Sequence, residues 1–223
     1  DYVASNGRFD FFGVRVAGLT SQEFKLRISS TNLANTLSAE TSVFKVTADE
    51  ASVIEITRDV VANPGDISSA TRARFDVQPQ LTLYDSFSNI VTTDSTTRII
   101  AVLNSPNAQL VGQRVATAVR GIVTFQNLGV RGPLTESYTI TFREASQTEF
   151  DFYVQGDNNV TPVPNNTSDM SVDTTQVFNL NPGPAASFQV FLGMGDRQLS
   201  GSVAPAQPQL RIFDQDGDRK SVV

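Results

Sequence analysis

Gln78-Pro79-Gln80-Leu81-Thr82-Leu83-Tyr84-Asp85 recurs as Gln207-Pro208-Gln209-Leu210-Arg211-Ile212-Phe213-Asp214, with the same residue at five of the eight positions. The two copies begin 129 residues apart (207 − 78), a period too long for a solenoid repeat and typical of a whole β-sandwich domain. Each copy opens at Gln-Pro and runs into an acidic, turn-forming cluster, as a strand that leads into a hairpin would. The chain is therefore expected to be a slice of a tandem array.

Composition narrows the class of protein. The 223 residues are 39% hydrophobic and 18% charged, which is typical of a folded chain with one large or two ordinary domains. The net charge of −6 argues against a nucleic-acid partner, because such binding depends on clustered Lys and Arg. No apolar run reaches the roughly 18 residues of a transmembrane helix, and the first residues do not resemble a signal peptide, so we expect no membrane partner and a chain that is either mature or internal to a longer one.

Cysteine and histidine are both absent. Their absence excludes disulfides, thiolate or imidazole metal sites, and Ser-His-Asp or Cys-His nucleophilic catalysis. The sequence therefore predicts a protein that is not an enzyme and that holds no cofactor.

Apolar residues alternate with polar ones in short runs, which indicates strands and an all-β fold class. Turn formers such as Asn63-Pro64-Gly65-Asp66 and Gly132-Pro133 separate these runs. No helix longer than two turns is expected, and residues 30–39 are the place where a short helical turn fits best. The residues expected to line strand faces are Phe9 and Phe11; Phe24, Leu26 and Ile28; Phe44 and Val46; Ile54 and Ile56; Leu81 and Leu83; Val123 and Phe125; Tyr138, Ile140 and Phe142; Phe150 and Phe152; Phe178 and Leu180; Phe188 and Val190; Leu210 and Ile212.

The internal repeat extends beyond the two Gln-Pro strands. Residues 7–11 align with 121–125, and residues 24–28 align with 138–142, both at an offset of 114. Residues 41–46 align with 175–180, and 54–56 with 188–190, both at an offset of 134. The offset thus grows by about 20 residues, which predicts an insertion near 147–173 that forms a polar loop.

These alignments predict three parts. Residues 1–47 are the back half of one repeat, residues 48–181 are one complete repeat with the insertion, and residues 182–223 are the front half of another. A half sandwich exposes an apolar face and an unpaired strand edge, so each half needs a partner. We expect the two halves to complete one domain, either within the chain or between successive subunits, and the second arrangement generates a fibre.

The order of segments in the complete repeat carries a family resemblance. Ala51-Ser52-Val53-Ile54-Glu55-Ile56 precedes the Gln78 strand, Asn89-Ile90-Val91-Thr92-Thr93-Asp94-Ser95 follows it, and 121–128 and 138–142 close the repeat. This order, with Gly183-Pro184-Ala185-Ala186 at the next junction, resembles the tandem immunoglobulin-like repeats of extracellular surface proteins, including invasin-type and filamin-like modules. The resemblance implies a β-sandwich spacer or fibre module at the cell surface, and it carries over no catalytic residue.

Candidate modification sites cluster in the predicted polar loop. Three N-glycosylation sequons begin at Asn159, Asn165 and Asn166, and an exposed loop is where such acceptors are used. About three sequons are expected by chance in a chain of this composition, so the clustering is the informative feature. The alternative is O-linked sugar on Thr161, Thr167 or Ser168.

Acidic residues give weaker candidates. Asp214, Asp216 and Asp218 alternate as calcium ligands do, but the bidentate Glu of an EF-hand is missing and a hairpin turn is the preferred interpretation. No carboxylate pair for glycoside hydrolysis stands out, because the glutamates mostly fall in turns or on polar strand faces: Glu23, Glu40, Glu50, Glu55, Glu136, Glu144 and Glu149.

The interpretation favoured by the sequence is a structural subunit or segment of an extracellular, glycosylated fibre or surface array, built head to tail from copies of itself. Two alternatives stay open. One is an adhesin stalk made of the same repeats, and the other is a non-catalytic accessory module of a secreted polysaccharide-degrading enzyme. The second is disfavoured because sugar-binding modules stack ligands on Trp or Tyr, and this chain has no Trp and four Tyr.

Overall fold

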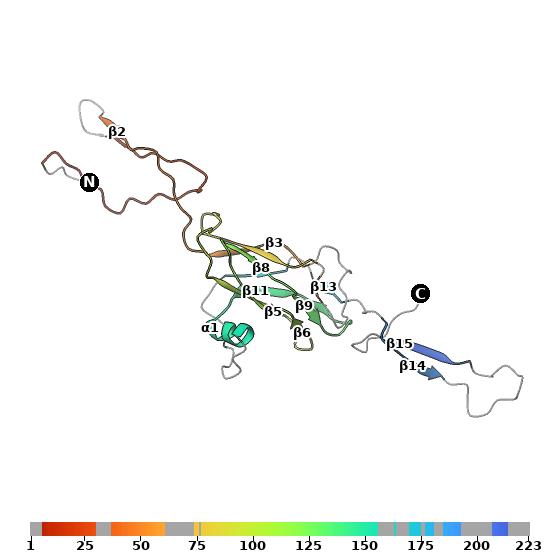
Figure 1. The fold of residues 1–223 in the computed structure, drawn as a ribbon. Helices are drawn as coiled ribbons and strands as arrows, with labels where there is room; N and C mark the ends of the chain where they lie inside the picture. Colours follow the sequence, from red (N-terminus) through yellow and green to blue (C-terminus); the bar gives the residue numbers. More distant parts are fainter. Residues whose placement is uncertain are drawn as a thin grey trace, which may run out of the picture.

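The computed structural model describes residues 6–29, 37–60, 74–75, 77–155, 163, 170–174, 177–180, 185–192 and 207–213. Strands dominate these residues, so the prediction of an all-β chain is confirmed (Figure 1). The elements are β1 (Arg27–Ser29), β2 (Ser38–Glu40), β3 (Val53–Arg58), β4 (Gln80–Tyr84), β5 (Arg98–Leu103), β6 (Gln109–Val111), β7 (Val115–Thr117), β8 (Ile122–Thr124), β9 (Gly129–Arg131), β10 (Ser137–Tyr138), β11 (Ile140–Glu144), α1 (Gln147–Phe150), a π-helical turn (Asp151–Gln155), β12 (Ser171–Asp173), β13 (Phe178–Asn179), β14 (Ser187–Leu192) and β15 (Gln209–Phe213).

The described residues between 48 and 180 form the central body. It contains an antiparallel three-stranded sheet, β3-β4-β8, and an antiparallel four-stranded sheet, β12-β11-β5-β7. Two further strand pairs, β6-β9 and β10-β13, complete it. All of these strands contribute side chains to one hydrophobic core, which includes Leu81, Val123 and Phe142. Ile100 of β5 and Val115 of β7 pack instead in a smaller cluster.

Strand β4, the first copy of the repeated stretch, lies in the middle of its sheet. Leu81 and Leu83 point into the core and are fully buried, as their alternation predicts. Pro79 precedes the strand and has no N–H to donate, but its carbonyl accepts a hydrogen bond from Phe125 N at 3.1 Å. The Gln78 side chain accepts from Leu128 N at 2.7 Å, so the Gln-Pro pair fixes where β4 begins.

Two arms extend from opposite ends of the central body (Figure 1). The N-terminal arm, residues 6–29 and 37–47, carries the β1-β2 hairpin, and the C-terminal arm, residues 185–192 and 207–213, carries the β14-β15 hairpin. Many of their apolar side chains are exposed, including Phe9, Phe188 and Leu210. Each arm therefore presents apolar surface that the central body does not cover.

One secondary-structure prediction is wrong. Phe150 and Phe152 were expected to line a strand, but residues 147–155 are helical. The cause is a capping box: the Ser146 hydroxyl accepts from Glu149 N at 3.2 Å, and the Glu149 carboxylate accepts from Ser146 N at 2.9 Å. The helical turn expected near 30–39 falls partly outside the described residues, and within the described part residues 38–40 form β2.

Candidate functional site

The residues proposed from sequence as modification or metal sites lie outside the described residues. This applies to the glycosylation candidates Asn159, Thr161, Asn165, Asn166, Thr167 and Ser168, and to the calcium candidates Asp214, Asp216 and Asp218. Among the residues that the structure does describe, no group of three or more His, Cys, Asp or Glu side chains is placed to hold a metal ion. These candidates remain predictions.

Val163, in the middle of the predicted polar loop, is tied to the body at the start of α1. Its N–H donates to Thr148 Oγ1 at 3.0 Å, and its carbonyl accepts from the hydroxyls of Ser146 and Thr148. The same Ser146 is the N-cap of α1. The helix therefore anchors the chain midway between the predicted sugar acceptors at 159–161 and 165–168.

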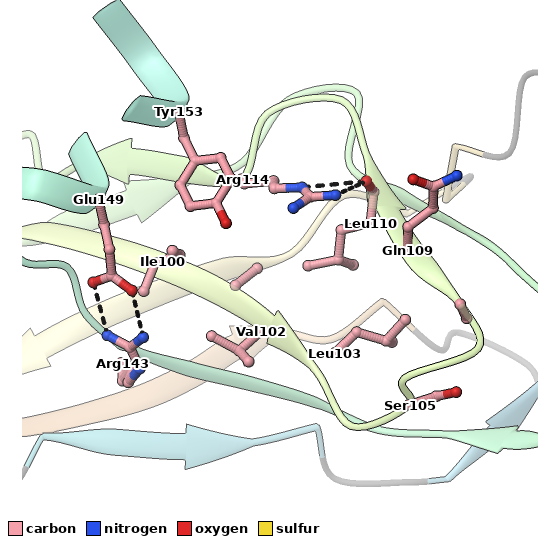
Figure 2. Close-up of a pocket in the computed structure, with 12 residues that line it drawn as sticks. Ile100, Val102, Leu103, Ser105, Gln109, Leu110, Arg114, Arg143, Glu149 and Tyr153 are labelled. Carbon is pink, nitrogen blue, oxygen red and sulfur yellow. Dashed lines mark hydrogen bonds and ion pairs between the residues drawn. The ribbon is translucent and has the colours of Figure 1, made fainter. Parts of the chain in front are cut away.

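The helical segment also closes a cavity of about 320 Å³ over β5 and β6 (Figure 2). Tyr153 and Glu149 reach toward these strands from above, and Ile100, Val102 and Leu110 form the apolar wall. The described lining includes one carboxylate, that of Glu149. Glycoside hydrolysis uses two carboxyl groups that face each other, so this cavity does not have that arrangement.

Glu149 is held in a short ion pair with Arg143, which also lines this cavity. Arg143 Nη2 lies 2.6 Å from Glu149 Oε1, and Arg143 Nη1 donates to Oε2 at 3.0 Å (Figure 2). Burial raises the pKa of the Glu149 carboxyl, but the hydrogen bonds from Arg143 and Ser146 and the Arg143 charge outweigh burial and hold the pKa below its usual range. The carboxylate is ionised and fully engaged, which fits a structural role.

The expectation that the glutamates lie on solvated surface is therefore wrong for Glu149, which is buried. The signal that could have shown this is the Ser146-Gln147-Thr148-Glu149 capping box, because N3 of a capping box turns back toward the helix start instead of toward water. Glu23, Glu40, Glu50 and Glu55 are exposed as expected, whereas Glu136 and Glu144 are half-buried.

A second polar cluster joins the N-terminal arm to the central body. Asn89 is buried after β4; its Nδ2 donates to Gly18 O at 3.0 Å, and its Oδ1 accepts from Thr20 N at 2.8 Å. Asp85 holds Asn89 in place by accepting from its backbone N–H at 2.9 Å and from its side chain at 3.0 Å. The turn that follows the first copy of the repeated stretch is thus a junction with residues 18–20.

Asp85 is itself buried and its carboxylate accepts four hydrogen bonds, three from backbone N–H groups and one from the Asn89 side chain. Burial raises the pKa of its carboxyl, but hydrogen bonds from Asn89, Asp49 N and Phe87 N outweigh burial and lower the pKa to about 2. The carboxylate is therefore ionised across the neutral and mildly acidic range, and the junction is a fixed polar contact.

The C-terminal arm has the same strand register as the buried β3-β4 pair. In β3-β4, Ile54 faces Leu83 and Ile56 faces Leu81, with a bulge before Arg58; in β14-β15, Phe188 faces Ile212 and Val190 faces Leu210, with a bulge before Leu192. The surroundings differ, however. Leu81 is 0% exposed and Ile54 4%, whereas Leu210 is 57% exposed and Phe188 72%. The arm presents to solvent the positions that form the core of the body.

The N-terminal arm matches the other half of the central body in the same detail. Strands β1-β2 pair Arg27 with Glu40 and Ser29 with Ser38, as β11-β12 pair Thr141 with Asp173 and Arg143 with Ser171. The bridge between Phe24 and Phe44 corresponds to the pair of Tyr138 with Phe178.

A hydrogen bond from a backbone N–H to a threonine hydroxyl repeats as well. Leu26 N donates to Thr41 Oγ1 at 3.1 Å, as Ile140 N donates to Thr174 Oγ1 at 3.3 Å. Thr41 therefore matches Thr174, one residue before the Thr175 of the sequence alignment.

Backbone conformation in the arm repeats too. Asn6 and Gly7 have φ values of 52° and 73°, and Arg120 and Gly121, 114 residues later, have 53° and 77°. Gly13 at 72° corresponds in the same way to Asn127 at 59°. A non-glycine residue rarely takes a positive φ, so the occurrence of these turns at matching positions supports the correspondence between the N-terminal arm and the central body.

No protein-family profile, no curated protein and no solved structure matches this chain. None of the described helices is long and apolar enough to cross a membrane.

Proposed function

We propose that this chain is a structural subunit or segment of an extracellular, glycosylated fibre or surface array, built from tandem immunoglobulin-like β-sandwiches. In this proposal each arm is half of one such module. The halves of successive subunits combine into one module at every joint in the fibre. By the alignment offsets, this module has no counterpart of about Ser95 to Arg114 of the central body, the region that contains β5 and β6. The activity of the protein is mechanical: it forms a rod through burial of strand faces and carries no catalytic step.

The proposal rests on one observation: both arms expose apolar residues whose counterparts in the central body are buried in its core. Residues that match the buried Ile54, Leu81 and Val123 by register or alignment are the exposed Phe188, Leu210 and Phe9, respectively. Exposed apolar surface of this kind indicates an interaction surface. Because the two arms lie at opposite ends of the central body, their union across molecules is head-to-tail association that does not close (Figure 1).

Extracellular location and glycosylation rest on other features. The chain has no Cys, so it tolerates an oxidising compartment without mispairing, and its sequons cluster in the sequence on either side of Val163, which hydrogen-bonds to the start of α1. Secretion of the chain from a eukaryotic host, followed by treatment with an N-glycosidase, tests this part. A mass decrease that is lost in the Asn159→Gln, Asn165→Gln, Asn166→Gln triple variant supports it, and an unchanged mass contradicts N-linked modification.

Assembly is tested on the whole chain by light scattering over a hundredfold range of concentration and by electron microscopy of the purified protein. Filaments with an average mass that rises with concentration support the proposal. A variant with Phe188→Asp and Leu210→Asp should remain monomeric, since both carboxylates fall on the face to be buried, while Glu55→Asp in β3 is the matched control on an exposed position. Extended monomers at every concentration would overturn the fibre and favour the adhesin stalk. Retention on an insoluble polysaccharide would favour the accessory module.

A further inference from the structure

We propose that the outer edge of β15 is completed by residues 8–10 of a second copy of this chain, antiparallel, with Gln209 opposite Asp10, Leu210 opposite Phe9 and Arg211 opposite Arg8. This inference rests on the proposed function and makes it specific, because it names the strand, direction and register of the joint. Among the described residues β15 pairs with β14 alone, which leaves this edge available.

The central body shows what covers the corresponding edge. There β4 pairs on its second side with β8, with Gln80 opposite Thr124, Leu81 opposite Val123 and Thr82 opposite Ile122. The shared β3-β4 and β14-β15 registers place Gln209, Leu210 and Arg211 where Gln80, Leu81 and Thr82 stand. The segment of the N-terminal arm that matches β8 is Arg8-Phe9-Asp10, at the offset of 114. The three pairs of the proposed joint follow directly from these correspondences.

The N-terminal arm already has the turns that position such a strand. In the body, Arg120 and Gly121 turn the chain into β8, and the bridge of Val119 with Ile122 spans this turn. Consecutive positive φ values are those of a type I′ hairpin turn, and Asn-Gly is its preferred sequence. Asn6-Gly7 has this sequence and these φ values immediately before Arg8. The turn that precedes β8 in the body therefore already has its counterpart directly before residues 8–10.

Side chains on both faces of the joint fit. On the inner face, Phe9 would lie against Leu210, and both are more than half exposed in the isolated chain. On the outer face, Gln80 Nε2 donates to Thr124 Oγ1 at 3.2 Å in the body, and the Gln209 amide can donate in the same way to the Asp10 carboxylate.

Arg211 adds an argument from charge. Its Nε is buried and has no hydrogen-bond partner among the described residues, and its guanidinium stacks on Phe191 at 3.4 Å from the ring centroid. In the proposed register Asp10 lies diagonally across from Arg211, within reach of a long side chain. Arg8 would face Arg211 directly, but Arg8 already pairs with Asp10 at 2.8 Å, so the carboxylate lies beside both guanidinium groups and offsets their repulsion.

The partner is a second copy because of where the arms lie. Figure 1 shows the central body between the N-terminal arm and β14-β15. One molecule cannot bring its own residues 8–10 to β15 without moving the arm across the whole body.

Disulfide trapping tests the register, and the chain has no native cysteine to interfere. In the body, Leu83 N donates to Gly121 O, directly opposite, so Gln80-Thr124 and Thr82-Ile122 are the non-hydrogen-bonded pairs, where Cβ atoms lie about 4.5–5.5 Å apart. Full-length Arg8→Cys is mixed with full-length Arg211→Cys under mild oxidation, which leaves Asp10 in place and removes both facing arginines. Arg8→Cys with Gln209→Cys is the crossed control, shifted by two residues to a separation of about 7–8 Å that disfavours a disulfide. Arg8 and Gln209 are exposed and Arg211 is half-buried in a two-stranded hairpin outside the core of the central body, so the variants should keep the circular dichroism spectrum of the parent chain.

We expect the Arg8-Arg211 mixture to form the mixed dimer at least fivefold faster than the crossed control. Equal rates, or filaments without either crosslink, would overturn the register and leave the proposed function standing. A chain that stays monomeric at every concentration would overturn both. In the double variant Arg8→Cys, Arg211→Cys, a ladder of oligomers supports the second copy, and an internally crosslinked monomer overturns it.

Discussion

Leu81 and Leu210 are the same residue in two copies of one strand, and replacing each with alanine separates their roles. Leu81 is fully buried between β3 and β8, so Leu81→Ala should lower the free energy of unfolding of the central body by about 3 kcal/mol through lost transfer energy and a residual cavity. For a body of this size that corresponds to a fall in Tm of roughly 10 °C. Leu210→Ala should leave the Tm of the body unchanged, because Leu210 is outside its core.

In the proposed fibre, Leu210→Ala should weaken the association between copies of the chain. About 57% of the Leu210 side chain remains to be buried when the arm is covered. If the covered site equals that of Leu81, association should weaken by about 1.7 kcal/mol, or roughly 16-fold in Kd. The Tm is measured by circular dichroism at a concentration where the chain is monomeric, and the Kd by sedimentation velocity.

Two results would refute the reasoning. A Tm decrease for Leu210→Ala as large as that for Leu81→Ala would mean that the C-terminal arm is part of the body's cooperative core. An unchanged Kd, in a chain whose parent associates measurably, would mean that association uses another surface. Glu55→Ala, at an exposed position of β3, is a control that should change neither quantity much.

Three further predictions concern the central body. Glu149→Gln removes the charge that Arg143 pairs with inside the body and weakens the capping box, so urea denaturation should show a loss of about 3 kcal/mol. The lowered pKa values of Asp85 and Glu149 mean that the contribution of each carboxylate to stability is complete above its pKa in the unfolded chain, near pH 4, and is lost as the pH falls through its lowered pKa in the folded chain, which is about 2 for Asp85. Asp85→Asn should flatten this acid limb, measured as Tm against pH. Gly112→Ala should prevent normal folding or lower the Tm by more than 10 °C, because Gly112 has φ of 82° and an added Cβ would lie 1.7 Å from Asn127 O.

Strand positions in the central body were predictable because successive side chains of a strand point to opposite faces. A strand with one buried face therefore alternates apolar and polar residues along the sequence. Ile54, Leu81, Val123 and Phe142 all occupy buried positions of strands, as their spacing predicts. Strand pairing gives a separation that can be compared with the predicted insertion. Arg143 and Ser171 pair although they lie 28 positions apart, whereas Ser29 and Ser38 lie nine apart, and the difference of 19 is close to the growth of the alignment offset.

The helix at 147–155 was not predicted, because Phe150 and Phe152 satisfy a strand pattern over a window too short to distinguish the two periods. The contact of Asn89 with Gly18 and Thr20 could not be predicted from the sequence either. It joins residues about 70 positions apart through a single side chain, and no periodicity reports such a contact. Hydrophobic patterning identifies faces, whereas polar junctions depend on the geometry of turns.

An exposed hairpin with an apolar face is a hazard unless something restricts what it pairs with, since an unpaired strand edge accepts almost any other strand. In the C-terminal arm, the bulge between Val190 and Leu192 and the charged Arg211 on the edge strand supply such restrictions. The bulge interrupts a continuous flat ladder, and Arg211 requires an acidic neighbour that is offset by two residues. Asp10 beside Phe9 meets that requirement, while a second β15 would bring Arg211 near another Arg211. In the proposed joint, these residues therefore favour one kind of partner, the opposite arm of another copy.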